Sequence, residues 1–332
     1  MIPIGVISTK GGVGKTTLTA NMGGLLADMG FRVLLIDCDI QPSLSKHFAL
    51  RYRAENGLTR FVTEHAISPE TISSTAIEGL DIVLSDSPGG QLAQWLQNRA
   101  DALFRLKTGL KHPYLDEHYD FVLMDTQGAR GPVHSLQNAV ILGAKLLVSP
   151  VRPAVSSARE FLSGMLEKLD ELRTLSEHMM LTLPTVQALI YDMERTNDAR
   201  SMAEEIRGQF IKTGAQVSVL ETIVPHSVAY NEAATRSIPV HRHEIVRRGS
   251  TPSAYEAMHA LVWEFLPATQ GVRAGTGERQ AEPVERIDAS STAAARSLTN
   301  PSTVSMDVGW TVRWTLRGRS WTAGCGWMNH PR

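Results

Sequence analysis

Short hydrophobic runs recur along the chain and are separated by glycine, proline and charged residues. Within each run the residues are apolar almost throughout, a pattern typical of strands that are buried on both faces of a parallel sheet. The expected strands are Ile2–Ser8, Arg32–Asp37, Leu80–Ser85, Phe121–Asp125, Ala144–Val151, Thr185–Asp192 and Val217–Pro225.

Longer stretches with helical character lie between these runs. The expected helices are Lys15–Met29, Val133–Leu142, Val155–Glu177, Ala199–Lys212 and Ser253–Leu266. Strand followed by helix, repeated along the chain, predicts an α/β fold with a doubly wound, mostly parallel sheet, right-handed crossovers and helices on both faces.

The alternating pattern ends at Pro267. Residues 268–332 are rich in Ala, Ser, Thr and Gly, and they contain eight arginines, five acidic residues, no lysine and four of the six tryptophans. Such a composition buries too little apolar surface to offset the entropy lost on ordering. We therefore expect a folded domain at 1–267 and a low-complexity, disordered tail at 268–332 that the domain does not need for its stability.

The overall composition says more about the cellular compartment of the protein than about its function. The formal net charge of the 332 residues is -1, so any basic surface must be a local patch. Two cysteines, Cys38 and Cys325, cannot build a disulfide framework or a four-thiolate metal site within one chain, which favours the reduced cytoplasm. The N-terminus lacks a signal-peptide pattern, and no apolar run approaches the roughly 20 residues that cross a bilayer.

A glycine-rich stretch, "STKGGVGKTTLTAN", follows the first expected strand and opens the first expected helix. Strand, glycine turn and helix in this order form the P-loop arrangement. Gly11, Gly12 and Gly14 let the backbone approach phosphate closely, and their amides together with the helix N-terminus attract an anion. We therefore expect a nucleoside triphosphate at this turn.

Three residues at the start of the helix have expected roles. Lys15 should reach the β- and γ-phosphates, the Thr16 hydroxyl should ligate Mg²⁺, and Thr17 should face the α-phosphate. A strict P-loop has glycine where this chain has Thr9. The expected nucleotide-binding residues of the turn are Lys10, Gly11, Gly12, Val13, Gly14, Lys15, Thr16 and Thr17.

The segment "KGGVGKTT" resembles the deviant P-loop of the ParA/MinD class of ATPases. In that class an extra lysine reaches into the partner's site across a sandwich dimer that holds two nucleotides. The resemblance implies that Lys10 is this lysine, that the nucleotide is ATP, and that ATP drives homodimer formation. A cation delivered in trans neutralises charge that develops on the transferring phosphoryl group. The alternative is a solvated loop cation.

Carboxylates end two of the expected strands. "DCDIQP" resembles the family's "DxDPQG", which implies that Asp39 positions the attacking water and that Asp37 supports the Mg²⁺ shell. Both aspartates could instead cap the next helix. Asp125 ends a third apolar run and fits the Walker B position, where an acid holds Mg²⁺ through water. Gln127 and Gly128 follow where the family usually has proline. With Lys10 and Lys15, Asp39 completes the expected catalytic set.

Two late segments, 189–207 and 223–240, resemble ParA segments that wall the adenine and lie near the DNA-binding face. The resemblance implies that Pro225 packs near the base. His226 and Ala229 stand where relatives often carry arginines. The candidate DNA-binding residues are Arg236, Arg242, Arg247 and Arg248.

The resemblance implies a ParA-type partition ATPase. Its ATP dimer would bind DNA without sequence preference, and a ParB-like adaptor would stimulate hydrolysis, so that the protein is cytoplasmic and nucleoid-associated. A MinD-like membrane-cycling ATPase is one alternative, for which the tail would have to contact lipid. An amidoligase-type synthetase is another, and it would couple ATP turnover to a small acid without DNA.

Overall fold

The computed structural model describes residues 1–128, 136–153, 155–178, 182–212, 217–247, 249–275, 311–316 and 319–324. These residues belong to two compact units, Met1–Gly275 and Thr276–Arg332. All the site residues discussed below lie in the first unit.

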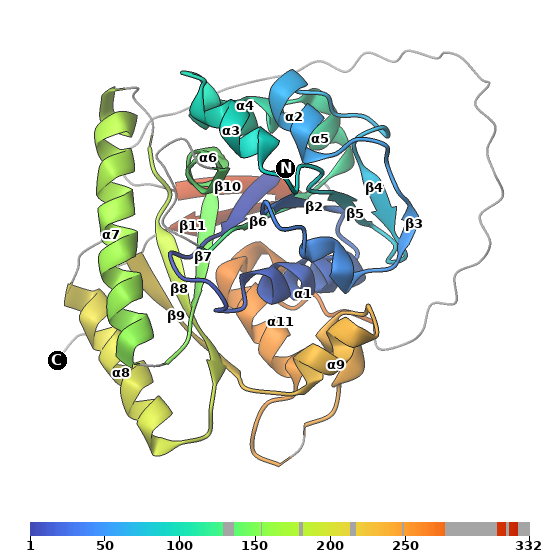
Figure 1. The fold of residues 1–332 in the computed structure, drawn as a ribbon. Coiled ribbons are helices and arrows are strands. Elements are labelled where there is room, and N and C mark those ends of the chain that lie inside the picture. The colour runs from blue at the N-terminus through green and yellow to red at the C-terminus, as the bar shows by residue number, and fades with distance from the viewer. Residues whose placement is uncertain are drawn as a thin grey trace. The chain divides into compact units, whose positions relative to one another are not determined.

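The first unit is built on one mixed, mostly parallel sheet, which confirms the predicted fold class (Figure 1). The strand order is β3-β4-β5-β2-β6-β1-β7-β8-β9, and only β4 runs antiparallel to its neighbours. The seven predicted strands are all present, and β3 and β4 were not expected. The strands are β1 (Ile2–Val6), β2 (Val33–Cys38), β3 (Leu50–Tyr52), β4 (Ser73–Thr75), β5 (Leu80–Val83), β6 (Phe121–Thr126), β7 (Leu146–Val151), β8 (Val186–Met193) and β9 (Val217–Pro225).

Helices cover both faces of this sheet (Figure 1). One face carries α1 (Lys15–Asp28), α9 (Ala229–Thr235), α10 (Val240–His243) and α11 (Ala254–Phe265). The other face carries α2 (Leu58–Glu64), α3 (Gln91–Gln97), α4 (Ala102–Gly109), α5 (Pro113–His118), α6 (Leu136–Gly143), α7 (Val155–His178) and α8 (Asn197–Lys212). Two 3₁₀ turns, η1 (Leu44–His47) and η2 (Pro267–Thr269), complete the unit. Of the predicted helix 133–142, residues 133–135 lie outside the described residues.

Central strands are apolar throughout because both of their faces are covered. In β2, Leu34 belongs to the core cluster shared with α2–α8, whereas Leu35 packs against Gly23 of α1, and both side chains are fully buried. This double burial explains why the sequence shows continuous apolar runs instead of alternation. Among the described residues, no helix combines the length and the apolar character needed to span a membrane.

The first unit continues past the predicted boundary at Pro267. Trp263 Nε1 donates to the Val272 carbonyl at 2.9 Å, and the Ala274 amide donates to His259 Nε2 at 3.1 Å. Thr269 and Ala274 are buried. The segment up to Gly275 therefore packs on α11.

The second unit contains an antiparallel hairpin of β10 (Thr311–Leu316) and β11 (Arg319–Gly324), in which Trp314 pairs with Trp321. The prediction of a tail without regular structure did not anticipate this hairpin.

Candidate active site

The glycine-rich turn lies at the switch point of the sheet. β1 runs between β6 and β7, so the strands after it wind outward in opposite directions and leave a crevice at their carboxyl ends. The chain turns there and starts α1 at Lys15. Gly14 caps the helix at φ 94°, and a Cβ at this position would lie 2.4 Å from Tyr191 Cε1. Only glycine fits, and the first amides of α1 meet the crevice without a capping side chain.

A cleft of about 460 Å³ opens at this point and gathers most of the predicted nucleotide-binding residues. Lys10, Val13 and Pro225 are not part of its lining: Val13 is buried, and Pro225 ends β9. Residues that the sequence analysis did not select also line it. The lining residues are Gly11, Gly12, Gly14, Lys15, Thr16, Thr17, Asp39, Gln41, Gln127, Gly128 and Arg152.

Asp125 and Thr16 form the part of the site that fits a metal ion. Asp125 Oδ2 accepts a hydrogen bond from Thr16 Oγ1 at 2.7 Å, and Asp125 Oδ1 accepts one from Thr19 Oγ1 at 3.4 Å. Burial raises the pKa of Asp125 to about 7, so the ionised carboxylate is unfavourable there unless a cation binds beside it. Carboxylate and hydroxyl oxygens are the ligands that Mg²⁺ prefers. Thr16 and Asp125 therefore suit Mg²⁺.

Phosphate would have to complete that metal site. Within the described ranges, no group of three or more His, Cys, Asp or Glu side chains could hold a metal ion. Mg²⁺ is commonly bound by one or two carboxylates together with substrate phosphates, which matches a site that needs the nucleotide.

Lys15 supplies the buried cation. Its side chain is buried, and Nζ donates to the Lys10 carbonyl at 3.4 Å. Burial lowers the pKa of Lys15, against the opposing effect of Asp125 and Asp39. Phosphate oxygens beside Nζ would favour the charged form, so a nucleotide and the protonated lysine stabilise each other.

Asp37 organises the loop that follows β2. It is fully buried, and it accepts hydrogen bonds from the amides of Asp39 at 3.2 Å, Ser43 at 3.2 Å and Leu44 at 3.1 Å. Burial raises its pKa to about 6. Ser43 Oγ in turn lies 3.4 Å from Thr16 Oγ1. The described contacts of Asp37 go to amides of the loop and of the start of η1, and its place in the Mg²⁺ shell stays a prediction.

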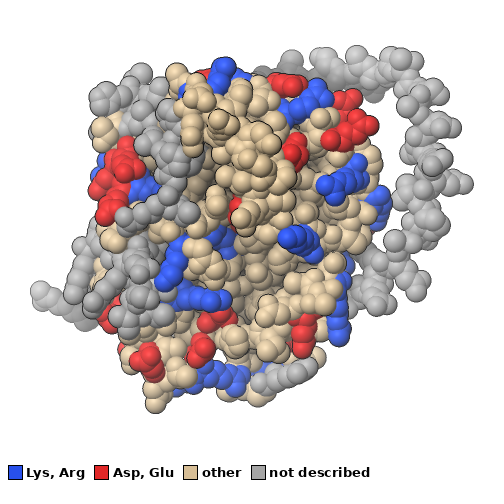
Figure 2. All heavy atoms as spheres, in the orientation of Figure 1, with Lys and Arg blue, Asp and Glu red and all other residues tan. Residues whose placement is uncertain are grey.

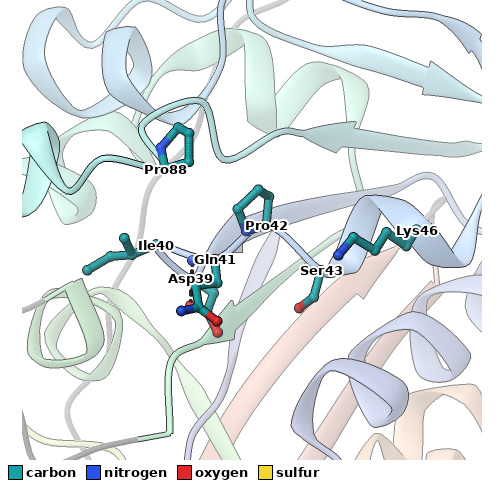
Figure 3. Close-up of a pocket in the computed structure, with 7 residues that line it drawn as sticks. All are labelled: Asp39, Ile40, Gln41, Pro42, Ser43, Lys46 and Pro88. Carbon is teal, nitrogen blue, oxygen red and sulfur yellow. Dashed lines mark hydrogen bonds between the residues drawn. The ribbon is translucent and has the colours of Figure 1, made fainter.

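Asp39 lies between the nucleotide cleft and a second cavity. Its Oδ1 accepts from the Gln41 amide at 2.9 Å, which orients the carboxylate. Asp39 and Gln41 line both the cleft and a second cavity of about 410 Å³ (Figure 3). Pro88 lies across that cavity from both side chains. The second cavity is lined by Asp39, Ile40, Gln41, Pro42, Ser43, Lys46 and Pro88.

Two functional candidates escaped the sequence analysis. At Gly128 a Cβ would lie 2.4 Å from both the Lys10 carbonyl oxygen and Lys15 Nζ. In the sequence this glycine is visible only as a departure from the family's proline. Arg152 follows β7, and its Nη2 lies 2.8 Å from Asp192 Oδ2. Its place after a buried strand was the only available signal, because carboxyl ends of parallel strands meet at one edge.

The candidate DNA-binding arginines are mostly paired. Arg242 Nε donates to Asp28 Oδ2 at 2.6 Å, and Arg247 binds Glu256 through Nε at 2.9 Å and Nη2 at 3.1 Å. Arg236 Nη1 lies 3.4 Å from His243 Nδ1. Arg248 lies outside the described residues. On the face shown in Figure 2, basic and acidic side chains are interspersed.

The chain is similar to several known proteins. A family model described as an AAA domain matches residues 1–181. The sporulation initiation inhibitor protein Soj of Bacillus subtilis is 25% identical over 249 residues, which cover 74% of this chain and 93% of the relative. The chromosome-partitioning ATPase Soj of Thermus thermophilus is 29% identical over 269 residues, or 80% of this chain and 96% of the relative.

A solved McdA–ATP complex from Cyanothece superposes with a TM-score of 0.61 at 19% identity, over 73% of this chain and 90% of that one. At this identity the likeness concerns the fold.

Proposed function

Because this chain belongs to the ParA/MinD family of P-loop ATPases, we propose that it is a partition ATPase that segregates a plasmid, another mobile element or a chromosome. ATP and Mg²⁺ are its cofactors. In this proposal ATP binding forms a homodimer, the dimer binds DNA without sequence preference, and a ParB-like adaptor stimulates hydrolysis. The protein then works in the cytoplasm on the nucleoid. Support comes from a relative named as a chromosome-partitioning ATPase, the Soj protein of Thermus thermophilus, which matches over 96% of its length.

The cleft residues divide the chemistry among them. Lys15 neutralises the phosphates, and Thr16 and Asp125 would hold Mg²⁺, which supplies charge stabilisation to the transferring phosphoryl group. Asp39, oriented by the Gln41 amide, receives hydrogen bonds from the attacking water. The amides at the start of α1 bind phosphate oxygens as fixed dipoles.

The observation that carries the proposal is the position of two lysines in one turn. Lys15 is buried inside its own cleft. Lys10 contributes its carbonyl to Lys15 Nζ, but it does not line that cleft. A second lysine at the turn that does not line its own cleft supports a role in the partner's cleft, where it would link ATP occupancy to dimer formation.

Two lysine variants test this division. We expect Lys15→Ala to lose nucleotide binding, and Lys10→Ala to bind ATP as a monomer that neither dimerises nor hydrolyses it. Light scattering and fluorescent-nucleotide binding measure both outcomes. Lys111→Ala, which removes an exposed charge elsewhere, is the matched control. A normal ATP-dependent dimer of Lys10→Ala would reject the trans role.

DNA binding in the proposal rests on the arginine group that follows the late ParA-like segment. Arg242 and Arg247 are held by Asp28 and Glu256, so they must exchange a carboxylate for a DNA phosphate. Arg236 has a weaker contact and is the best placed of the group. A dimer places two copies of this arginine group along one DNA duplex. This explains why the ATP-bound dimer should bind DNA and the monomer should not.

A mobility shift on random duplex tests the DNA proposal, at low and moderate salt, with and without ATP. We expect binding only with ATP, a steep loss with salt because counterions are released, and no sequence preference. Changing Arg236, Arg242, Arg247 and Arg248 together to alanine should remove binding, whereas Arg99→Ala should not. Binding that ignores ATP or survives the quadruple change contradicts the arginine group.

The second cavity favours one further candidate function, an ATP-dependent synthetase. It adjoins the cleft at Asp39 and Gln41, and Lys46 would attract an acidic substrate. ATP turnover that requires a small carboxylic acid and an amine donor, and that DNA does not affect, would favour this candidate over partition.

A further inference from the structure

Three residues that end neighbouring strands meet on the β7–β9 side of the P-loop. Asp192 is the penultimate residue of β8, and its two carboxylate oxygens have different partners. Arg152 Nη2 lies 2.8 Å from Oδ2, and His226 Nδ1 lies 2.6 Å from Oδ1. The mechanism proposed above uses none of these side chains.

Arg152 also lines the nucleotide cleft, together with Gly11, Gly12 and Gly128. β7 pairs with β1, and Ser149 Oγ donates to the Ile7 carbonyl at 2.6 Å, so the chain that leaves β7 runs beside the first half of the P-loop turn. Thr17, where the α-phosphate is expected, lies beyond the other end of the turn, in the first turn of α1. The terminal phosphate therefore belongs at the end of the cleft where Arg152 lies.

We propose that Arg152 is a sensor of the terminal phosphate, which releases Asp192 and binds the γ-phosphate when ATP occupies the cleft. This inference rests on the proposed function only in taking ATP as the nucleotide. With ADP, which lacks that phosphate, Arg152 stays on Asp192. Arg152 would then be a specificity-determining residue for ATP over ADP.

The exchange is favourable because the present ion pair is weak and the new one is strong. The Arg152 side chain is 48% exposed and that of Asp192 is 24% exposed, and ion pairs near the surface contribute little stability. A guanidinium binds phosphate through two parallel hydrogen bonds, and phosphate carries more charge than a carboxylate. Asp192 is not left alone, because His226 stays on its other oxygen.

The exchange also joins the cleft to the far edge of the sheet. Asp192 precedes the loop into α8, and His226, whose amide donates to the Met193 carbonyl at 2.8 Å, begins the segment into α9. Once Arg152 leaves, the negative charge of Asp192 faces His226 alone. The electrostatic surroundings of both loops thus depend on which nucleotide is bound.

Arg152→Ala tests the sensor directly. Its affinity for fluorescent AMPPNP should fall about tenfold, the value of one charged hydrogen-bonded contact, while its affinity for the matching ADP analogue stays within about twofold. Measurements use Mg²⁺ and dilute protein that light scattering shows to be monomeric. Arg99→Ala is the matched control, because it breaks another exposed arginine–aspartate pair that lies outside the cleft.

Asp192→Asn tests the exchange. Asparagine tolerates the φ of 60° found at this residue, so the backbone is kept while the competing charge is removed. AMPPNP affinity should rise about threefold, because AMPPNP binding no longer has to break one exposed ion pair. In the Arg152→Ala background the same change should have no effect, because the two residues act through each other.

Equal loss of both analogues in Arg152→Ala, or no loss of either, would overturn the sensor, as would an effect of Asp192→Asn that persists without Arg152. Melting temperatures of all variants within about 2 °C of the parent exclude unfolding as the cause. These experiments contain no DNA and no dimer, so a failure of the partition proposal leaves their outcome unchanged.

Discussion

The two sides of the P-loop are built in opposite ways. On the side of β2 and β6, Asp37 and Asp125 are fully buried and held by backbone amides and threonine hydroxyls. On the side of β7 to β9, Arg152 and His226 are about half exposed and are held mainly by Asp192. The acidic side is therefore preformed for a metal ion, whereas the basic side can exchange partners at little energetic cost.

This difference has an energetic basis. Buried carboxylates without a cation are unfavourable, as the raised pKa values of Asp125 and Asp37 indicate, so the acidic side gains stability when Mg²⁺ arrives. Exposed ion pairs change stability little when they open. We expect mutations on the acidic side to change chemistry and global stability together, and mutations on the basic side to change nucleotide preference alone.

Asp125→Asn should have the largest effect. Without the charge of Asp125, Mg²⁺ and the terminal phosphate are poorly placed, and steady-state ATP hydrolysis should fall by at least about 100-fold. Asp170→Asn, which changes an exposed acid on α7, should hydrolyse ATP normally. Hydrolysis by Asp125→Asn at more than a tenth of the parental rate would show that the acidic side is not the metal side.

The same variant should be more stable than the parent in the absence of metal and nucleotide. The folded pKa of Asp125, about 7, exceeds the unfolded value of about 3.9. Ionisation therefore destabilises the folded state progressively above pH 4 and fully above pH 7. With EDTA, Asp125→Asn should raise the melting temperature by about 2–4 °C at pH 8 and not at pH 4.5. Asp39 still provides Lys15 with a counter-charge. A gain that grows toward low pH would contradict the sign.

Asp39→Ala should separate binding from chemistry on the acidic side. ATP affinity should stay within about twofold, because Asp39 contributes to water placement and not to phosphate binding, and turnover should fall about 100-fold. An ATP-bound dimer should accumulate in light scattering. If the variant hydrolyses ATP like the parent, another residue positions the water.

Gly128→Ala should have a smaller effect on ATP binding. It tests the position of Lys15, which lies between the acidic and the basic side. A Cβ there would meet Lys15 Nζ and a backbone carbonyl at 2.4 Å, so the loop or the lysine must shift. We expect ATP affinity to fall about tenfold, which corresponds to one lost charged contact. Gly208→Ala is the control, since a Cβ on that α8 glycine meets nothing within 4 Å. Unchanged affinity would mean that Lys15 does not need its present position.

Truncation should have the smallest effect, because neither side of the P-loop as described uses residues beyond Gly275. A chain that ends at Gly275 should keep its melting temperature and ATP affinity. A chain that ends at Pro267 should melt several degrees lower, since Trp263, His259 and Tyr255 each lose a hydrogen-bond partner. Equal melting temperatures for the two truncations would show that this segment does not stabilise the first unit.

Local patterns explain how much could be predicted from the sequence. The central strands and Asp125 were found because continuous burial and a strand-end acid leave a signal within a few residues. β3, β4 and α2 to α5 are short and depend on packing against distant strands, so no local signal marks them. Arg152 and Gly128 escaped for a related reason. Their roles come from Asp192 and Lys15, which are close only once the sheet has assembled.

The central position of β1 has a consequence for synthesis on the ribosome. β1 is made first, but its neighbours β6 and β7 begin at Phe121 and Leu146. At about 5–20 residues per second, the emerging β1 waits on the order of ten seconds for its first partner. During that time both edges of an apolar strand are unpaired. The nascent chain should therefore engage a chaperone at its N-terminus before it can bind ATP.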